Sequence, residues 1–329
     1  MTEMSKYPWA QWMQPGDFIS EKPSYPTGKY LDLFEDRVFA GCDEQVGQLR
    51  YYVYDPVKHG APADRRYPVI FALHGAGGSL AGKLAVNWAG VEMFASPDYQ
   101  ARMGGAYIVA PLANETGDPK NPMTWMTPLP GGNLEGYSPK LRAQLEPWLK
   151  ENPRFLSLFG ADSIYTTTLW AVLQEARASF TNAGKTVLFG TSAGGYGAWR
   201  FLLRYTQAID AALIMAGAYL PSEADLEKIR SAKLPLWLCH GKHDECVPFE
   251  RMAQPILPLL EEMPTVQTYF PELVRRGDHG VASNAAGGME IGQHCINDAI
   301  QQDLIFEDGQ PYDERFPDGV TGWVKRNAG

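Results

Sequence analysis

The apolar residues of this chain follow two alternating patterns. Short continuous apolar runs, typical of strands buried on both faces of a parallel sheet, recur from residue 48 onward. These runs lie at 48–54, 68–73, 106–111, 185–189, 210–216, 235–239 and 266–270. Between them, apolar residues recur at helical spacing, as in Leu169, Val172, Leu173 and Ala176. The alternation predicts an α/β fold in which a mostly parallel central sheet carries helices on both faces.

The first 47 residues do not share this alternation. They are rich in proline and aromatic residues and contain no long periodic element. We expect residues 1–47 to form an arm that packs on the body or on a neighbouring subunit. Residues 48–329 would then form the α/β domain.

A second irregularity lies at about 112–162, between one predicted strand and the next helix. Ordinary connections have a median of roughly 4 to 6 residues, so this insertion is expected to be a lid or a mobile loop. Its second half, 138–158, has the apolar spacing of a helix. Its first half carries Met123, Trp125 and Met126. These residues are expected either to line an apolar substrate pocket or to fix the insertion to the body.

The segment with the clearest chemistry is centred on Ser192. It reads Gly190-Thr191-Ser192-Ala193-Gly194 and lies between an apolar run and a segment with helical spacing. A strand that turns sharply into a helix holds a serine in a strained conformation and exposes its hydroxyl, which predicts a nucleophile elbow. The alternative is a glycine-rich turn that cradles phosphate, but no GxxxxGK[ST] or GxGxxG pattern accompanies it.

An oxyanion hole is predicted upstream, where an apolar run leads into His74-Gly75-Ala76-Gly77-Gly78. A glycine-rich strand exit can expose backbone N–H groups to the charged tetrahedral intermediate. We assign the donors to the N–H of Ala193 and that of Ala76 or Gly77. The alternative is a plain turn that ends the strand. His74 is expected to be structural.

The acid and the base of a hydrolytic site should follow the serine in chain order. Asp244 lies on a loop after the strand 235–239, where its carboxylate can accept a hydrogen bond from the base, and Glu245 is the adjacent competitor. His279 lies in the glycine-flanked loop Gly277-Asp278-His279-Gly280 and is the predicted base. The rival is His294, whose surroundings have helical spacing, whereas the base is expected on a loop.

These four segments together resemble the α/β-hydrolase fold. The elbow at 190–194, the HGxGG segment at 74–78, the acid segment at 240–248 and the loop at 277–280 are similar to those of dienelactone hydrolase, polyhydroxybutyrate depolymerase and feruloyl esterase-like enzymes. The resemblance implies a Ser192, Asp244 and His279 triad that hydrolyses carboxylic esters through an acyl-enzyme. It implies no metal and no organic cofactor. Thr191 precedes the serine, so the cysteine pair that links the serine and histidine loops in tannase-like feruloyl esterases is not reproduced.

Composition narrows the function classes. The net charge of −9 and the scattered basic residues argue against nucleic acid as a partner. No run of 18 apolar residues and no N-terminal stretch of signal-peptide type occurs, so we expect a cytoplasmic protein that does not enter a membrane. The four cysteines lack metal-ligand spacing and are expected to be thiols.

The expected substrate is a small-molecule or oligosaccharide-linked ester of plant type, such as a feruloyl or acetyl ester. Serine peptidases, thioesterases and acyltransferases share the same triad and remain alternatives. A non-catalytic binding module with a hydrolase-like fold is the alternative from another class. The aromatic arm is compatible with a homodimer.

Overall fold

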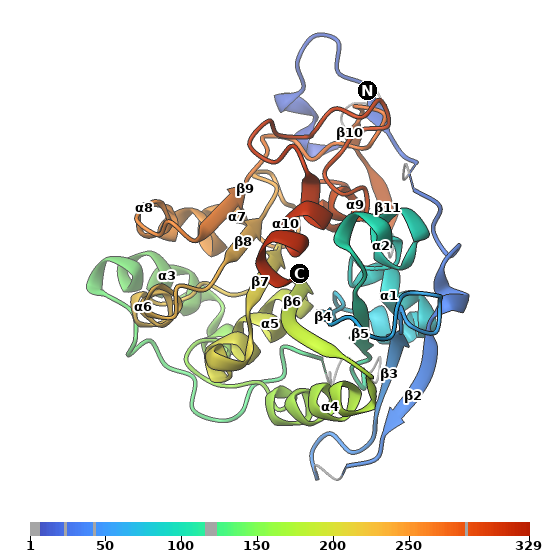
Figure 1. The fold of residues 1–329 in the computed structure, drawn as a ribbon. Coiled ribbons are helices and arrows are strands. Elements are labelled where there is room, and N and C mark those ends of the chain that lie inside the picture. Colours follow the sequence, from blue (N-terminus) through green and yellow to red (C-terminus); the bar gives the residue numbers. More distant parts are fainter. Residues whose placement is uncertain (1–6, 23–24, 42–43, 116–123, 287–288) are drawn as a thin grey trace.

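The computed structural model describes residues 7–22, 25–41, 44–115, 124–286 and 289–329 (Figure 1). Its centre is an eight-stranded sheet with the order β2-β3-β5-β4-β6-β7-β8-β9. The strands of this sheet are β2 (Glu35–Phe39), β3 (Leu49–Tyr54), β4 (Tyr67–Leu73), β5 (Tyr107–Pro111), β6 (Ala183–Thr191), β7 (Ala211–Met215), β8 (Leu236–Cys239) and β9 (Val266–Tyr269). Within the described residues, two short strand pairs lie outside it: β1 (Ile19–Ser20) with β10 (Val281–Ala282), and β11 (Asn284–Ala286) with β12 (Met289–Ile291).

The sheet confirms the mostly parallel arrangement. From β5 to β9 all neighbouring strands run parallel, and β3 is antiparallel to both β2 and β5. The seven expected strands all form, with ends that differ from the predicted ones by at most two residues. Strands such as β4 and β7 are buried at every position, which explains their continuous apolar sequence.

The strand β2 was not expected, and it lies before the predicted domain boundary at 47/48. Its residues alternate between half-buried and exposed, as in an edge strand, and three of the five are charged. Charged side chains on an edge discourage pairing with another chain, so such a strand lacks the apolar signature of its neighbours. The sheet therefore begins at Glu35, within the segment that the sequence assigned to the arm.

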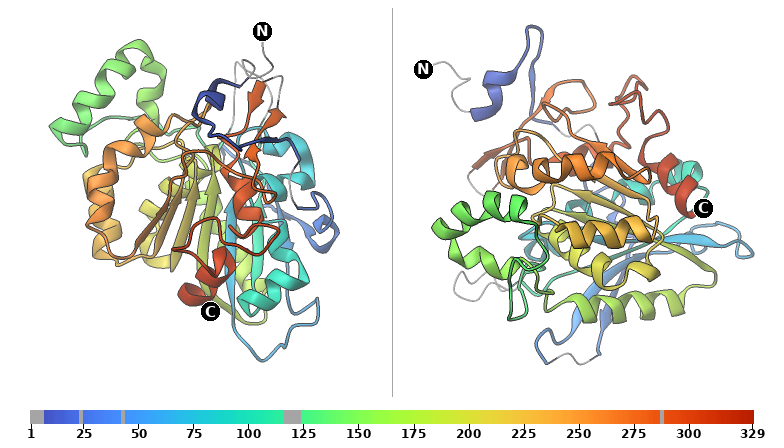
Figure 2. Two further views of the ribbon diagram at one scale, coloured as in Figure 1. Left: turned by 90° about the horizontal axis from the view of Figure 1, so that it is seen from above. Right: turned by 90° about the vertical axis from the view of Figure 1, so that its left-hand side faces the viewer.

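Helices cover both faces of the sheet (Figures 1 and 2). The α-helices are α1 (Ala85–Trp88), α2 (Pro97–Met103), α3 (Pro139–Glu151), α4 (Thr166–Ser179), α5 (Ala193–Arg204), α6 (Glu223–Ser231), α7 (Phe249–Met252), α8 (Leu257–Glu261), α9 (Ile296–Gln301) and α10 (Gly319–Ala328). Two apolar clusters separate the layers. One contains buried residues of α3, α4, α5 and α6, and the other contains buried residues of α1, α2, α9 and α10. Leu169, Val172, Leu173 and Ala176 of α4 are buried in the first cluster, as their spacing predicts.

The described part of the N-terminal arm packs on the body of its own chain. Trp9 is buried in a small cluster with Leu273 and Val281, and β1 pairs in parallel with β10. The ring of Trp12 stacks on His243 with a centroid separation of 3.4 Å. The arm thereby contacts the loop that follows β8.

The second half of the insertion forms α3 and a 3-10 helix over Pro153–Leu158. It is attached to α5 and to the segment before α6. The Tyr137 hydroxyl donates to the Leu220 carbonyl at 2.6 Å, and the buried Arg200 guanidinium pairs with Asp162 at 3.0 Å. Across the described residues, no helix has the length and apolar character that a bilayer crossing requires.

Candidate active site

The loops that carry the predicted chemistry leave the sheet at one edge. The last residues of the central strands are in register: Leu73 pairs with Gly190, Thr191 with Met215, and Met215 with Cys239. Because these strands are parallel, the turns that follow them emerge side by side. In open α/β sheets this carboxyl edge is where ligands bind.

Ser192 lies at the sharp turn between β6 and α5, as the sequence predicts. Its backbone has φ 54° and ψ −117°, a region that non-glycine residues rarely occupy and that costs roughly 1–3 kcal/mol. Its N–H donates to the Met215 carbonyl at 2.9 Å, and its carbonyl accepts from the N–H groups of Tyr196 and Ala218. These bonds hold the strained residue in place and direct its side chain away from the sheet.

The glycines on either side of Ser192 are required by close backbone contacts. A Cβ at Gly190 would overlap the Gly194 carbonyl and lie 2.6 Å from Cβ of Ala198. A Cβ at Gly194 would overlap the carbonyl of Leu73 at the end of β4. The GxSxG pattern thus lets the start of α5 approach both its own strand and the neighbouring one.

Ser192, His294 and Asp244 form a continuous chain of hydrogen bonds. His294 Nε2 lies 3.0 Å from Ser192 Oγ, and His294 Nδ1 lies 2.9 and 2.8 Å from the two carboxylate oxygens of Asp244. Since a carboxylate only accepts, Nδ1 carries the proton and Nε2 is left to accept from the serine hydroxyl. This is the arrangement of a nucleophile, a base and an orienting acid.

The environment of Asp244 keeps its carboxylate ionised. Burial raises the pKa of Asp244, but the His294 charge and hydrogen bonds from His240 and His294 outweigh it, so the pKa lies well below 3.8. The backbone N–H groups of Cys246 and Val247 also donate to Oδ1, at 2.8 and 2.7 Å. The acid is therefore a fixed negative charge beneath the imidazole.

The same charges act on the base. Burial lowers the pKa of His294, but the negative charge of Asp244, its hydrogen bond, and then the charge of Glu245 together raise that pKa above 6.5. An imidazole with a raised pKa is a stronger proton acceptor near neutral pH.

The prediction of His279 as the base is wrong in this geometry. The structure does not bring His279 to Ser192: its Nε2 lies 2.9 Å from Asp308 Oδ2, its ring stacks on Phe306, and its side chain is 48% exposed. The loop is held elsewhere because Arg276, fully buried, forms an ion pair with Asp298. His294, the rival in the sequence, takes the position instead.

The helical spacing around His294 belongs to the residues that follow it. Helix α9 begins at Ile296, and its buried residues Ile296, Ala299 and Ile300 produce the periodicity. His294 lies just before this helix, on a turn, as a base should. A usable signal was the placement of the histidine immediately ahead of an amphipathic helix, rather than inside it.

The 74–78 segment lies beside the serine. A Cβ at Gly75 would be 3.5 Å from Cβ of Ser192. The buried His74 holds the turn: its Nδ1 donates to the Gly75 carbonyl at 2.7 Å, and its Nε2 accepts from the Ala113 N–H at 3.1 Å. Burial lowers the pKa of His74 to about 4, so the ring is neutral and can accept at one nitrogen while donating at the other. The structural role expected of His74 is confirmed.

The predicted oxyanion donors are available at this place. Within the described residues, none of the turn, loop or side-chain hydrogen bonds uses the N–H of Ala76, Gly77 or Ala193. Ala193 is the first residue of α5, and the first N–H groups of a helix have no acceptor within it. The positive end of the helix dipole lies at the same position and favours negative charge there.

Trp125, one of the predicted pocket residues, does not line the site. Trp125 is fully buried: its ring packs against the rings of His74 and Tyr165, with centroid separations of 5.1 and 4.9 Å. It therefore fixes the insertion under the 74–78 turn, and its assignment to the substrate pocket is wrong. Met126 is half-buried and packs against the same apolar cluster. Met123 lies outside the described residues.

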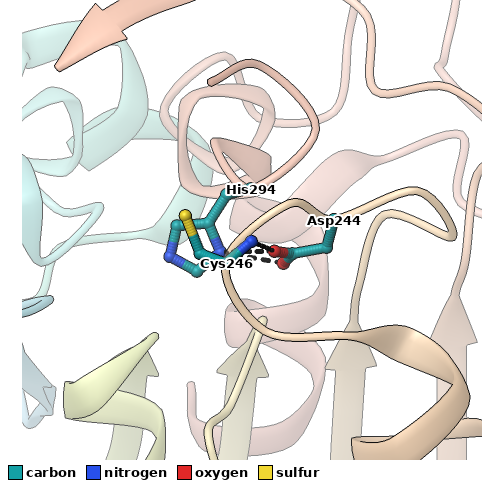
Figure 3. Close-up of side chains that lie close together, drawn as sticks. All are labelled: Asp244, Cys246 and His294. Carbon is teal, nitrogen blue, oxygen red and sulfur yellow. Dashed lines mark hydrogen bonds and ion pairs between the residues drawn. The ribbon is translucent and has the colours of Figure 1, made fainter. Parts of the chain in front are cut away.

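Asp244, Cys246 and His294 are a set of side chains that could hold a metal ion (Figure 3). One ligand atom from each lies within 4.8 Å of the others. However, both carboxylate oxygens of Asp244 already accept from His294 Nδ1. A cation here would compete with the hydrogen bond that orients the imidazole.

Solved structures provide a comparison for the fold. A thermostable esterase is similar at a TM-score of 0.58 and 17% identity, covering 92% of this chain and 64% of that one. The BES protein from Bacillus cereus is similar at a TM-score of 0.49 and 17% identity, covering 86% and 97%. A feruloyl esterase module from Clostridium thermocellum is similar at a TM-score of 0.43 and 14% identity, covering 87% of this chain and 94% of that one. No family model matches the chain, and no curated protein matches it.

The sheet order, the strand-to-helix elbow and the similarity to the thermostable esterase define the α/β-hydrolase fold. The chain spans 64% of the length of that esterase. At 17% identity this similarity establishes the fold, and the chemistry has to be argued from the site itself.

Proposed function

We propose that this protein is a carboxylic ester hydrolase that uses Ser192 as its nucleophile. The observation that carries the proposal is the hydrogen-bonded chain from Ser192 through His294 to Asp244 at the carboxyl edge of the sheet. Ser192 has a strained backbone. Beside it, backbone N–H groups that have no other acceptor among the described residues can donate hydrogen bonds to the carbonyl oxygen of a substrate. Acyl transfer needs both parts, and a binding module needs neither.

In the proposed mechanism His294 Nε2 takes the proton of Ser192 as Oγ attacks the ester carbonyl carbon. The N–H of Ala193 and that of Ala76 or Gly77 bind the resulting oxyanion. The protonated imidazole, stabilised by Asp244, then gives its proton to the leaving alcohol, and an acyl-enzyme remains. Water attacks the acyl group in the same way, with His294 again as base, and the acid product leaves.

The raised pKa of His294 predicts the pH dependence of the reaction. The base must be neutral to accept the serine proton, so kcat/KM should fall as the pH drops through the pKa of His294 in the free enzyme. Because this pKa is raised, the midpoint of the acidic limb should lie above 6.5. Asp244→Asn removes the charge that contributes most to the increase and should move the midpoint to lower pH. A wild-type midpoint below 6.5 would contradict this electrostatic account.

The substrate class within esters is part of the proposal. We infer a plant-type ester with a bulky or aromatic acyl group, such as a feruloyl ester, in preference to a simple acetyl ester. The supporting observation is Trp88, which is 39% exposed at the end of α1. A Cβ at Gly77 would lie 3.5 Å from its ring, so the indole borders the predicted oxyanion turn. An exposed aromatic face at this place offers a stacking surface to an aromatic acyl group.

Trp88→Ala should therefore separate the two substrate types. We expect kcat/KM for a methyl hydroxycinnamate to fall about tenfold, in keeping with the roughly 0.5–1.5 kcal/mol of an aromatic pair beyond its area burial. The value for p-nitrophenyl acetate should change less than about twofold, and it serves as the internal control. Equal losses on both esters would remove Trp88 from substrate selection.

The rival reactions on the same fold are tested by a panel of substrates. The wild-type protein is assayed with p-nitrophenyl esters, an aminoacyl amide and an acyl-CoA, with and without an added alcohol acceptor. The proposal predicts the highest kcat/KM for oxygen esters, with water as the acceptor. Preference for the amide, the thioester or the alcohol acceptor would instead establish a peptidase, a thioesterase or an acyltransferase. No turnover of any substrate would favour a binding module.

A further inference from the structure

The carboxylate of Glu245 binds three consecutive backbone N–H groups. Its Oε1 accepts from Gly292 and Gln293, each at 3.1 Å, and its Oε2 accepts from His294 at 3.0 Å. Glu245 is half-buried, and hydrogen bonds to an ionised acceptor are stronger than neutral ones. One side chain therefore binds three successive backbone N–H groups of the turn that carries the proposed base.

The position of this turn decides whether the imidazole reaches both of its partners. The ring is bonded at each end, to Asp244 at 2.8 and 2.9 Å and to Ser192 at 3.0 Å. A displacement of the His294 backbone by about 1 Å would lengthen at least one of these bonds beyond a useful distance, and misplacements of that size can cost about a hundredfold in rate.

Asp244 and Glu245 divide the task between them. Asp244 binds the side chain of His294 and fixes the ring, whereas Glu245 binds the backbone of the same residue and its two predecessors. Because Asp244 and Glu245 are neighbours in the chain, a movement of the loop after β8 displaces the contact to the imidazole and the contact to the His294 backbone together. The acid and the base are thereby fixed relative to each other.

The other side of the turn is held by the side chain of Gln293, while the Gln293 carbonyl packs against Gly241 of the acid loop. This fully buried side chain accepts from the Val274 N–H at 2.6 Å and donates to the Ala282 carbonyl at 3.2 Å. These bonds connect the turn to the 274–282 segment. Glu245 provides three side-chain contacts between the turn and the loop that bears Asp244.

We propose that Glu245 is a positioning residue for the triad. It acts through His294 and does not touch the reacting atoms. The competition between Asp244 and Glu245 for the role of the acid is thus resolved by geometry: the Glu245 carboxylate faces backbone N–H groups, and the Asp244 carboxylate faces the imidazole. This inference rests on the proposed ester hydrolase function.

The charge of Glu245 also provides a second readout. The groups that face His294 are Asp244, Glu245 and Cys246 from the acid loop and Ser192 from the elbow, with Cys295 beside it in the chain. Both carboxylates raise the pKa of His294. Removing the Glu245 charge should lower this pKa and move the acidic limb of the kcat/KM profile to lower pH, which a purely structural role would not do.

The test compares Glu245→Gln, Glu245→Ala and Glu245→Asp with wild type. The matched control is Glu250→Gln, which removes the same charge from an exposed position on α7. With p-nitrophenyl acetate we expect kcat to fall about 10- to 100-fold in Glu245→Gln and further in Glu245→Ala, with KM changed less than about threefold. Glu245→Asp keeps the charge and should recover part of the loss. Glu250→Gln should behave as wild type.

Each variant is assayed well below the midpoint of its thermal denaturation. Its activity is then divided by the folded fraction that the denaturation curve gives at the assay temperature. If kcat per folded molecule and the acidic limb stay at wild-type values in Glu245→Gln and Glu245→Asp, the positioning role is overturned. Ser192→Ala is assayed in parallel. If wild type and Ser192→Ala hydrolyse the ester equally, the proposed function fails instead, and the two failures are therefore distinguishable.

Discussion

His294→Ala should lower kcat for ester hydrolysis by about four to six orders of magnitude. Without the imidazole no group takes the proton of Ser192, and loss of a triad member in a serine hydrolase leaves only the contribution of the oxyanion hole and of binding. KM should change little, because the imidazole acts in the transition state. The measurement is steady-state hydrolysis of p-nitrophenyl acetate, corrected for the uncatalysed rate.

His279→Ala is the matched control for that result. Its side chain is exposed and bonded to Asp308, so its loss should leave kcat within about twofold of wild type. The pair of variants distinguishes the two histidines that the sequence alone left in competition. A large loss in His279→Ala with retained activity in His294→Ala would reverse the assignment.

Ser192→Ala should abolish turnover to within the background rate, a loss of about a millionfold if kcat resembles that of other triad enzymes. The variant should fold, because alanine removes only the hydroxyl and the bonds that hold the elbow come from the backbone. Ser231→Ala, at the exposed end of α6, is the matched control and should keep full activity. Thermal denaturation should show the same midpoint for both variants and wild type within a few degrees.

A residual activity of Ser192→Ala above about one per cent of wild type would remove this serine from the mechanism. The acyl-enzyme would then form at another residue, or the protein would activate water directly. Either result would leave the strained backbone of Ser192 without an explanation in chemistry.

Most of the central sheet was predictable because its strands are buried on both faces. β4 and β7 have no exposed position, so their sequences are continuous apolar runs between turn signals. The elbow was predictable for a related reason. A side chain at Gly190 would overlap Gly194 and Ala198, and a side chain at Gly194 would overlap Leu73. Only glycine fits at these two positions, so the requirement is visible in the sequence.

The edge strand was harder to predict because it has no apolar signal, and the base was harder to predict because a strong helical signal follows it. β2 is half exposed and largely charged, so its pairing with β3 leaves no apolar run. His294 lies next to a strong helical signal that starts two residues later at Ile296. The turn that carries His294 is held by long-range bonds, among them those that its backbone N–H groups donate to Glu245, and spacing along the chain does not encode them.

Trp125 illustrates the same limit for substrate contacts. An aromatic residue on a proline-punctuated loop has the composition of a pocket wall, yet it is buried against His74 and Tyr165. Trp88, in a short helix without an evident motif, is the exposed aromatic that borders the oxyanion turn. Composition identifies which residues are apolar, but whether such a residue is exposed to a substrate depends on how the surrounding segments pack.

The convergence of Ser192, His294 and Asp244 is tested most directly by labelling with a fluorophosphonate and mapping the adduct by mass spectrometry. The account predicts a single phosphonylated residue, Ser192, in the wild-type protein, and a labelling rate at least about a thousandfold lower in His294→Ala, because the serine is activated by that imidazole. An adduct on another residue, or equal labelling rates in the two proteins, would contradict it.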